Sequence, residues 1–160
     1  MYGIVNKLIQ LNKSISTMES CTGGCIANAI TNIPGSSDVF KFGAVTYSNE
    51  YKIKLGVSEE LISKYSVYSK EVSDSMSKTI SNYTDSDYGI GITGKLNRVD
   101  KNNEFGSDNV VYISIYDRVN DRFYNSIVTV LYDDRCKNKE MVLDSVIKLL
   151  EEVIWEYIIH

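Results

Sequence analysis

The short turn Glu19-Ser20-Cys21-Thr22-Gly23-Gly24 separates a strand candidate over residues 14–18 from a helix candidate over residues 25–30. Small residues leave backbone N–H groups approachable, and glycine allows a tight turn close to a ligand. The start of the following helix adds a positive dipole end, so the turn is suited to an oxyanion or a phosphate. Two interpretations follow: a catalytic turn with Ser20 or Cys21 as nucleophile, or a tight strand-to-helix connection.

Helix and strand candidates alternate along the rest of the chain, as hydrophobic periodicity indicates. The helix candidates cover residues 2–11, 50–55, 59–65, 69–83 and 138–157. The strand candidates cover residues 40–47, 88–93, 109–117 and 123–132, the last two as a hairpin. This order predicts an α/β fold, a three-layer α/β/α sandwich with a mixed, mostly parallel sheet, in one domain over residues 1–160. We expect Ser20 or Thr22 to cap the helix after the turn.

The composition is that of an ordinary globular protein, with 43% hydrophobic and 24% charged residues. A net charge of -4 argues against a broad nucleic-acid-binding surface. Apolar runs are far shorter than the roughly 20 residues of a membrane helix, and the first residues lack a signal-peptide pattern. We therefore expect a cytoplasmic protein with no membrane or nucleic-acid partner.

Cysteine and histidine are too few for several common chemistries. Cys21, Cys25 and Cys136 do not form an even disulfide framework, and no histidine supports a zinc site around them. The only histidine, His160, is the last residue, where a catalytic imidazole would be poorly held. A serine nucleophile therefore needs another base, and we expect neither a metal nor a cofactor.

A second polar cluster, Tyr47-Ser48-Asn49-Glu50-Tyr51-Lys52, follows a strand candidate. Ligands of α/β sheets bind at the carboxyl ends of strands, and Lys52 follows Ser48 by one helical turn. A partly buried lysine loses its proton more easily, which would suit it as a base. The structural alternative is that Tyr47 packs, Asn49 caps a helix and Lys52 is solvated.

Two further positions are candidates for the same crevice. Thr93 and Gly94 end a third strand candidate, so a hydroxyl and a glycine backbone would line its carboxyl end. Arg135 is the best-placed cation for a phosphate, because a guanidinium binds phosphate in a bidentate fork. Its alternative role is an ion pair at a helix start with Asp133 or Asp134.

Taken together, these clusters resemble the C-terminal domain of the CinA family, the nicotinamide mononucleotide deamidases. The resemblance spans nearly the whole chain in the right order. The matching stretches are Thr17-Met18-Glu19-Ser20-Cys21-Thr22-Gly23-Gly24, Pro34-Gly35-Ser36-Ser37, Val45-Thr46-Tyr47-Ser48-Asn49-Glu50-Tyr51-Lys52, Leu55-Gly56-Val57, Val67 with Ser69-Lys70-Glu71-Val72, and Ile92-Thr93-Gly94.

This resemblance implies hydrolysis of the nicotinamide carboxamide to nicotinate mononucleotide and ammonia, without a metal. It implies Ser20 as the nucleophile, Lys52 and Tyr47 as its activating partners, and backbone N–H groups from Cys21 to Gly24 as oxyanion donors. The partner is a small nucleotide, and we expect a homo-oligomer. The expected substrate-binding residues are Glu19, Cys21, Thr22, Gly23, Gly24, Ser48, Asn49, Thr93, Gly94 and Arg135.

The sequence departs from the family pattern at two places. After Thr-Gly the family continues with an Ile-Ala-Gly-Pro and glycine-rich loop, whereas here a polar stretch runs over residues 95–108. Tyr68 is an extra residue before a matching helix start. Lys95, Arg98 and Lys101 offer other contacts to a phosphate. Two alternatives therefore stay open: a catalytically impaired pyridine-nucleotide-binding or interaction protein, and an amidase with a shifted substrate.

Overall fold

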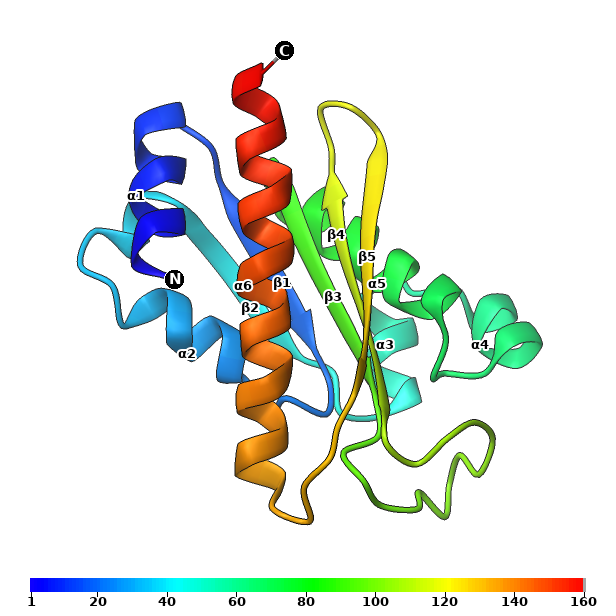
Figure 1. Ribbon diagram of the computed structural model, residues 1–160. Helices are drawn as coiled ribbons and strands as arrows, with labels where there is room; N and C mark the ends of the chain where they lie inside the picture. The colour runs from blue at the N-terminus through cyan, green and yellow to red at the C-terminus, as the bar shows by residue number, and fades with distance from the viewer. Residues whose placement is uncertain (160) are drawn as a thin grey trace.

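A five-stranded mixed sheet forms the centre of the protein, and helices cover both of its faces (Figure 1). The computed structural model describes residues 1–159, with side chains through Trp155, so His160 lies outside the described residues. The strands are β1 (Ile15–Glu19), β2 (Phe40–Val45), β3 (Tyr88–Gly94), β4 (Val110–Asp117) and β5 (Arg122–Thr129). Their order is β2-β1-β3-β4-β5. The first three run parallel, and β4 is antiparallel to β3 and β5. The predicted α/β sandwich is confirmed.

The helices form the two outer layers (Figure 1). One layer holds α1 (Tyr2–Leu11), α2 (Cys25–Thr31) and α6 (Arg135–Ile159), with a short 3-10 helix, η1 (Ser36–Asp38), after α2. The other holds α3 (Asn49–Leu55), α4 (Glu59–Tyr65) and α5 (Lys70–Thr84). Each layer buries its own apolar cluster against the sheet, the larger one under α1, α2 and α6. No helix within residues 1–159 is both long and apolar enough to cross a membrane.

Strand β3 shows how residue size sets the spacing of the layers. Its alternate residues Tyr88, Ile90 and Ile92 belong to the larger core, so Gly89 and Gly91 face α5. A Cβ at Gly91 would lie 2.3 Å from the carbonyl oxygen of Ser73, and one at Gly89 would lie 2.0 Å from the carbonyl oxygen of Ser77. The backbone of α5 therefore packs directly on β3.

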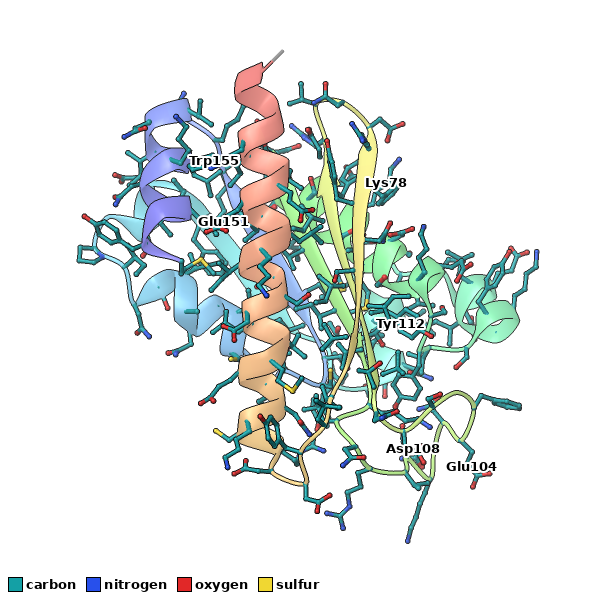
Figure 2. All side chains as sticks on the ribbon, in the orientation of Figure 1. Lys78, Glu104, Asp108, Tyr112, Glu151 and Trp155 are labelled. Carbon is teal, nitrogen blue, oxygen red and sulfur yellow. The ribbon has the colours of Figure 1, made fainter. Side chains whose placement is uncertain are left out.

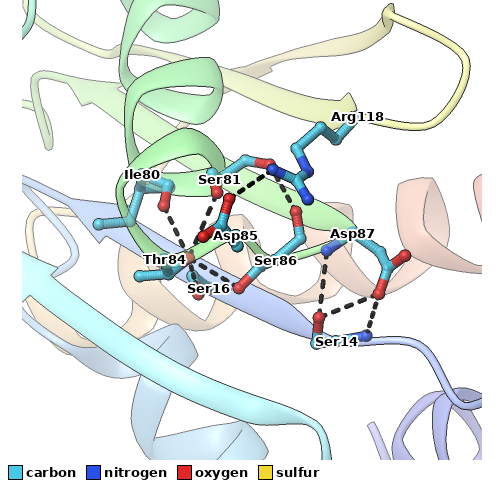
Figure 3. Close-up of polar contacts among 9 residues, drawn as sticks. All are labelled: Ser14, Ser16, Ile80, Ser81, Thr84, Asp85, Ser86, Asp87 and Arg118. Carbon is cyan, nitrogen blue, oxygen red and sulfur yellow. Dashed lines mark hydrogen bonds and ion pairs between the residues drawn. The ribbon is translucent and has the colours of Figure 1, made fainter.

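The amino ends of β1 and β3 are joined by hydroxyl and carboxylate groups (Figure 3). Ser16 lies 2.5 Å from the Ser86 hydroxyl and 2.8 Å from that of Thr84, measured between oxygens. Asp87 accepts hydrogen bonds from the backbone N–H and the hydroxyl of Ser14. These groups satisfy one another at this end of the sheet, while the opposite, carboxyl ends of the same strands carry the polar clusters singled out in the sequence.

Element boundaries differ from the predicted ones at several strand and helix ends, and β5 ends at Thr129, three residues before the predicted end. β2 ends at Val45, two residues early, and β3 pairs antiparallel with β4 in addition to the predicted hairpin. Helix α6 begins at Arg135 and not at residue 138. It starts early because the Asp134 carboxylate accepts from the backbone N–H groups of Cys136 and Lys137, as an N-cap does.

Candidate active site

Glu19 organises the turn that joins β1 to α2. Its side chain is fully buried, and one carboxylate oxygen accepts from the Thr22 hydroxyl at 2.6 Å and the Ile26 N–H at 3.0 Å. The other oxygen accepts from the Ala27 N–H at 3.0 Å. The carboxylate thus satisfies first-turn donors that a capping side chain would otherwise take. Gly24 occupies the N-cap position with φ 94°, so the predicted cap by Ser20 or Thr22 is wrong.

Ser20 and Lys52 form a buried hydrogen-bonded pair. Lys52 Nζ lies 3.1 Å from Ser20 Oγ and donates to the carbonyl oxygen of Thr46 at 2.7 Å. Ser20 follows directly after β1, and Lys52 comes from α3, whose start is capped by the Ser48 hydroxyl. Only 7% of Ser20 and 2% of Lys52 are exposed to solvent. The alternative of a solvated Lys52 is therefore excluded.

The surroundings of this pair favour Ser20 over Cys21 as nucleophile. Burial lowers the pKa of Lys52 from 10.5 to about 8, against a smaller opposing effect of nearby negative groups that include Asp100. Burial also raises the pKa of the Cys21 thiol to about 12. A thiol with so high a pKa forms almost no thiolate at neutral pH, so it is a poor nucleophile. A lysine with a pKa near 8 is a usable base.

The pair opens into a cavity of about 490 Å³ at the carboxyl ends of β1 and β3. Lys52, Lys95, Arg98 and Arg135 bring four cationic side chains to its wall, and Asp100 brings a carboxylate. The wall is completed by Ser20, Cys21, Tyr47, Ser48, Asn49, Val67, Tyr68, Gly94, Leu96, Val99, Asn102 and Asn103. An excess of positive charge around a serine and lysine suits an anionic substrate.

Eight of the predicted site residues come together in this wall. They are Ser20, Cys21, Tyr47, Ser48, Asn49, Lys52, Gly94 and Arg135. Tyr47 is 65% exposed, and its hydroxyl accepts from the Arg135 guanidinium at 3.2 Å. That contact places Tyr47 at the rim with the cation, so its expected part in activating Ser20 stays a prediction.

The other predicted site residues do not line this cavity. They are Glu19, Thr22, Gly23, Gly24 and Thr93. The Gly23 N–H donates to the Ser20 carbonyl oxygen at 3.0 Å, and the Thr93 hydroxyl donates to the Val67 carbonyl oxygen at 2.8 Å. Thr93 turns that way because, like Gly89 and Gly91, it belongs to the alternate set of β3 residues that faces α5.

Seven residues of the wall were not predicted from the sequence: Val67, Tyr68, Leu96, Val99, Asp100, Asn102 and Asn103. Tyr68 and the 95–108 stretch had been noted only as the two departures from the family pattern, which is an indirect signal that they belong to the site. Lys95 and Arg98, named as alternative phosphate contacts, do line the cavity, whereas Lys101 does not. Among the side chains described, through Trp155, no three His, Cys, Asp or Glu groups come together as a metal site requires.

Comparison with known proteins assigns the family. The family model of the CinA C-terminal domain matches residues 2–154. This chain belongs to the CinA family. A putative competence-damage inducible protein of Caldicellulosiruptor saccharolyticus is 35% identical over 155 residues, which are 96% of this chain and 37% of that protein. A CinA-like protein of Endomicrobium trichonymphae is 50% identical over 88 residues, or 54% of this chain and 21% of that protein. The chain thus spans well under half the length of these CinA relatives.

Solved CinA structures share the fold. The competence/damage inducible protein CihA of Agrobacterium tumefaciens matches with a TM-score of 0.80 and 28% identity, over 95% of this chain and 90% of that one. A CinA superfamily protein of Klebsiella pneumoniae matches with a TM-score of 0.88 and 22% identity, over 97% and 95% of the two chains. The α/β/α architecture is therefore that of the CinA superfamily.

Proposed function

We propose that this CinA domain is an amidase that hydrolyses nicotinamide mononucleotide to nicotinate mononucleotide and ammonia. The observation that carries the proposal is the buried pair of Ser20 Oγ and Lys52 Nζ, 3.1 Å apart in the wall of a cationic cavity. A serine nucleophile without histidine requires another base, and a lysine with a pKa of about 8 can supply one. The nucleotide itself follows from the sequence resemblance to the deamidases.

In the acylation step, neutral Lys52 accepts the Ser20 hydroxyl proton while Ser20 Oγ attacks the carboxamide carbon. The Thr46 carbonyl oxygen holds one Lys52 N–H at 2.7 Å, which keeps the nitrogen beside Ser20 Oγ while its lone pair accepts the proton. The resulting oxyanion is bound by the Cys21 N–H, the donor directly after the nucleophile. Collapse of the adduct breaks the C–N bond, and protonated Lys52 returns its proton to the leaving nitrogen, which departs as ammonia.

In the second step, water attacks the acyl-enzyme ester. Lys52 accepts a proton from that water and then returns a proton to Ser20 Oγ as the ester bond breaks, which releases the nicotinate and restores the site. Arg98 and Arg135 bind the phosphate at the rim, where guanidinium groups can contact its oxygens in pairs. Tyr47 supports Arg135 through the hydrogen bond between their side chains.

The test is ammonia release from nicotinamide mononucleotide by the purified chain, followed with a coupled assay. Ser20→Ala removes the nucleophile and is expected to abolish release, while Ser58→Ala, which changes a serine capping the distant helix α4, serves as the matched control. The proposal fails if the unmodified chain releases no more ammonia than Ser20→Ala. A panel of other carboxamides in the same assay distinguishes an amidase with a shifted substrate.

The second candidate function is nucleotide binding without turnover. It is favoured by the polar 95–108 loop, which forms part of the cavity wall in place of the family's glycine-rich loop. Calorimetry would show binding of nicotinamide mononucleotide with no ammonia released. Failure to bind any pyridine nucleotide would exclude this candidate as well.

A further inference from the structure

The two departures from the family pattern meet in the structure. The Tyr68 hydroxyl donates to the Asp100 carboxylate, and the Tyr68 ring lies 5.2 Å from Lys95 Nζ. Tyr68 precedes α5, whereas Lys95 and Asp100 belong to the 95–108 loop between β3 and β4. An added aromatic residue in one segment therefore contacts an altered loop in another, and both line the cavity.

The base of the 95–108 loop is fixed by contacts that do not involve the Tyr68 hydroxyl. Lys95 Nζ bonds to the Asp108 carboxylate at 3.0 Å, and the Arg98 N–H donates to the Asp108 carbonyl oxygen at 3.1 Å. The Leu96 side chain is buried in the core. The loop lies beyond the carboxyl end of β3, where Figure 2 labels its residues Asp108 and Glu104.

The tip of the loop, residues 99–105, has no comparable apolar anchor. Val99 is 62% exposed and Phe105 is 79% exposed, so burial of these side chains does not hold the tip. Its position depends on polar links: the Tyr68–Asp100 hydrogen bond and a second one of 3.1 Å from the Asn49 amide to Asn103. Asp100 also accepts from the Asn102 N–H and the Asn103 amide, which shapes the turn at the tip.

We infer that Tyr68 is a positioning residue, which holds the loop tip through Asp100 and so fixes the outer wall against which the nucleotide binds. The inference rests on the proposed function and deepens it. The Arg98 backbone stays bonded to Asp108, whereas Val99, Asp100, Asn102 and Asn103 of the tip line the cavity and lose their fixed position when the tip is released. Ser20 and Lys52 lie outside the tip, in the turn after β1 and in α3, and Asp100 has only a smaller effect on the Lys52 pKa than burial has. Loss of the Tyr68 hydroxyl therefore weakens substrate binding more than it slows catalysis.

The experiment compares the unmodified chain with Tyr68→Phe, which keeps the ring over Lys95 and removes only the hydroxyl. Tyr65→Phe is the matched control, because Tyr65 lies three residues away with its ring over Lys64 and outside the cavity wall. Hydrogen exchange of peptides that cover residues 99–105 is measured without ligand. We expect about tenfold faster exchange in Tyr68→Phe, the effect of losing one charge-assisted hydrogen bond.

Kinetics with nicotinamide mononucleotide give the second readout. Tyr68→Phe is expected to raise KM about tenfold with kcat within about twofold, since the lost contact acts on binding. Asp100→Asn keeps an acceptor for the Tyr68 hydroxyl. We therefore expect its exchange rate over residues 99–105 to be higher than that of the unmodified chain and lower than that of Tyr68→Phe. Exchange in Tyr68→Phe equal to that of Tyr65→Phe would overturn the inference, and so would faster exchange with unchanged KM.

Failure of the proposed function can be distinguished from failure of the inference about Tyr68. If the unmodified chain releases no ammonia, the exchange comparison still decides whether Tyr68 holds the tip. The Kd of nicotinamide mononucleotide from calorimetry then replaces KM, and it is expected to rise about tenfold in Tyr68→Phe. An unchanged Kd, or no binding by the unmodified chain, would refute the link from the tip to the nucleotide.

Discussion

Replacing Lys52 with methionine should make the protein more stable at neutral pH while it removes the proposed base. Lys52 is 2% exposed, and burial lowers its pKa from 10.5 to about 8. At pH 7 the amine is still mostly protonated, so the folded state carries a buried charge that the unfolded chain solvates. Methionine has a similar length and no charge, so Lys52→Met relieves that cost.

The magnitude follows from the pKa difference. A difference of about 2.5 pH units corresponds to roughly 3.4 kcal/mol of destabilisation at pH values below 8. Losing the hydrogen bond to the Thr46 carbonyl oxygen costs about 1 kcal/mol in return. We therefore expect Lys52→Met to raise the free energy of unfolding at pH 7 by about 2 kcal/mol.

The pH dependence gives the sign of this effect. Between pH 8 and 10.5 the unfolded chain binds more protons at this position than the folded chain, so the unmodified protein gains stability as pH rises. The advantage of Lys52→Met is full below pH 8 and should shrink by about 2 kcal/mol between pH 7 and pH 9.5.

Urea unfolding of the two proteins at both pH values measures the difference. Lys54→Met is the control, because Lys54 is an exposed lysine of the same helix, in an ion pair with Glu50. It should change the free energy of unfolding by less than about 0.5 kcal/mol. A Lys52→Met protein that is less stable than the unmodified one at pH 7, or a difference that does not depend on pH, would refute this reasoning.

Three further predictions concern activity and packing. The kcat/KM for ammonia release should rise with pH and level off above a midpoint near 8, because neutral Lys52 is the base, and a midpoint near 10.5 would contradict that role. Glu19→Ala should lower the free energy of unfolding by about 3 kcal/mol, since three buried donors lose their acceptor, and Glu19→Gln by about half as much in the same urea titration. Gly91→Ala should cost about 3 kcal/mol in thermal or urea unfolding, because its Cβ would meet the Ser73 carbonyl oxygen at 2.3 Å. Gly3→Ala is the control: it has open space around it and lies in helix α1, so it should stabilise the protein by up to about 1 kcal/mol.

Local sequence patterns were sufficient for the order and type of the elements. Apolar residues alternate or recur along segments such as 88–93 and 69–83, and each pattern depends only on near neighbours. The placement of Ser20 and Lys52 at one end of the sheet was also predictable, because the carboxyl ends of neighbouring parallel strands lie at one edge of a sheet. Spacing alone left open whether Lys52 is solvated or reaches Ser20. The lack of a usable histidine had required another base, and the family resemblance implied Lys52 and Tyr47 for that role.

Side-chain direction and contacts between distant segments were decided only by the tertiary structure. The family resemblance implied Glu19 as a substrate contact, but its buried carboxylate accepts from the first-turn N–H groups of α2, which have no partner within the helix. The contact of Tyr68 with Asp100 joins residues 32 positions apart, and no local pattern specifies such a pair. The sequence alone therefore determined which elements form and which end of the sheet carries the candidate site. Packing of the layers decided which side chains at that end reach the cavity, because hydrogen bonds and burial are settled by neighbours that are remote along the chain.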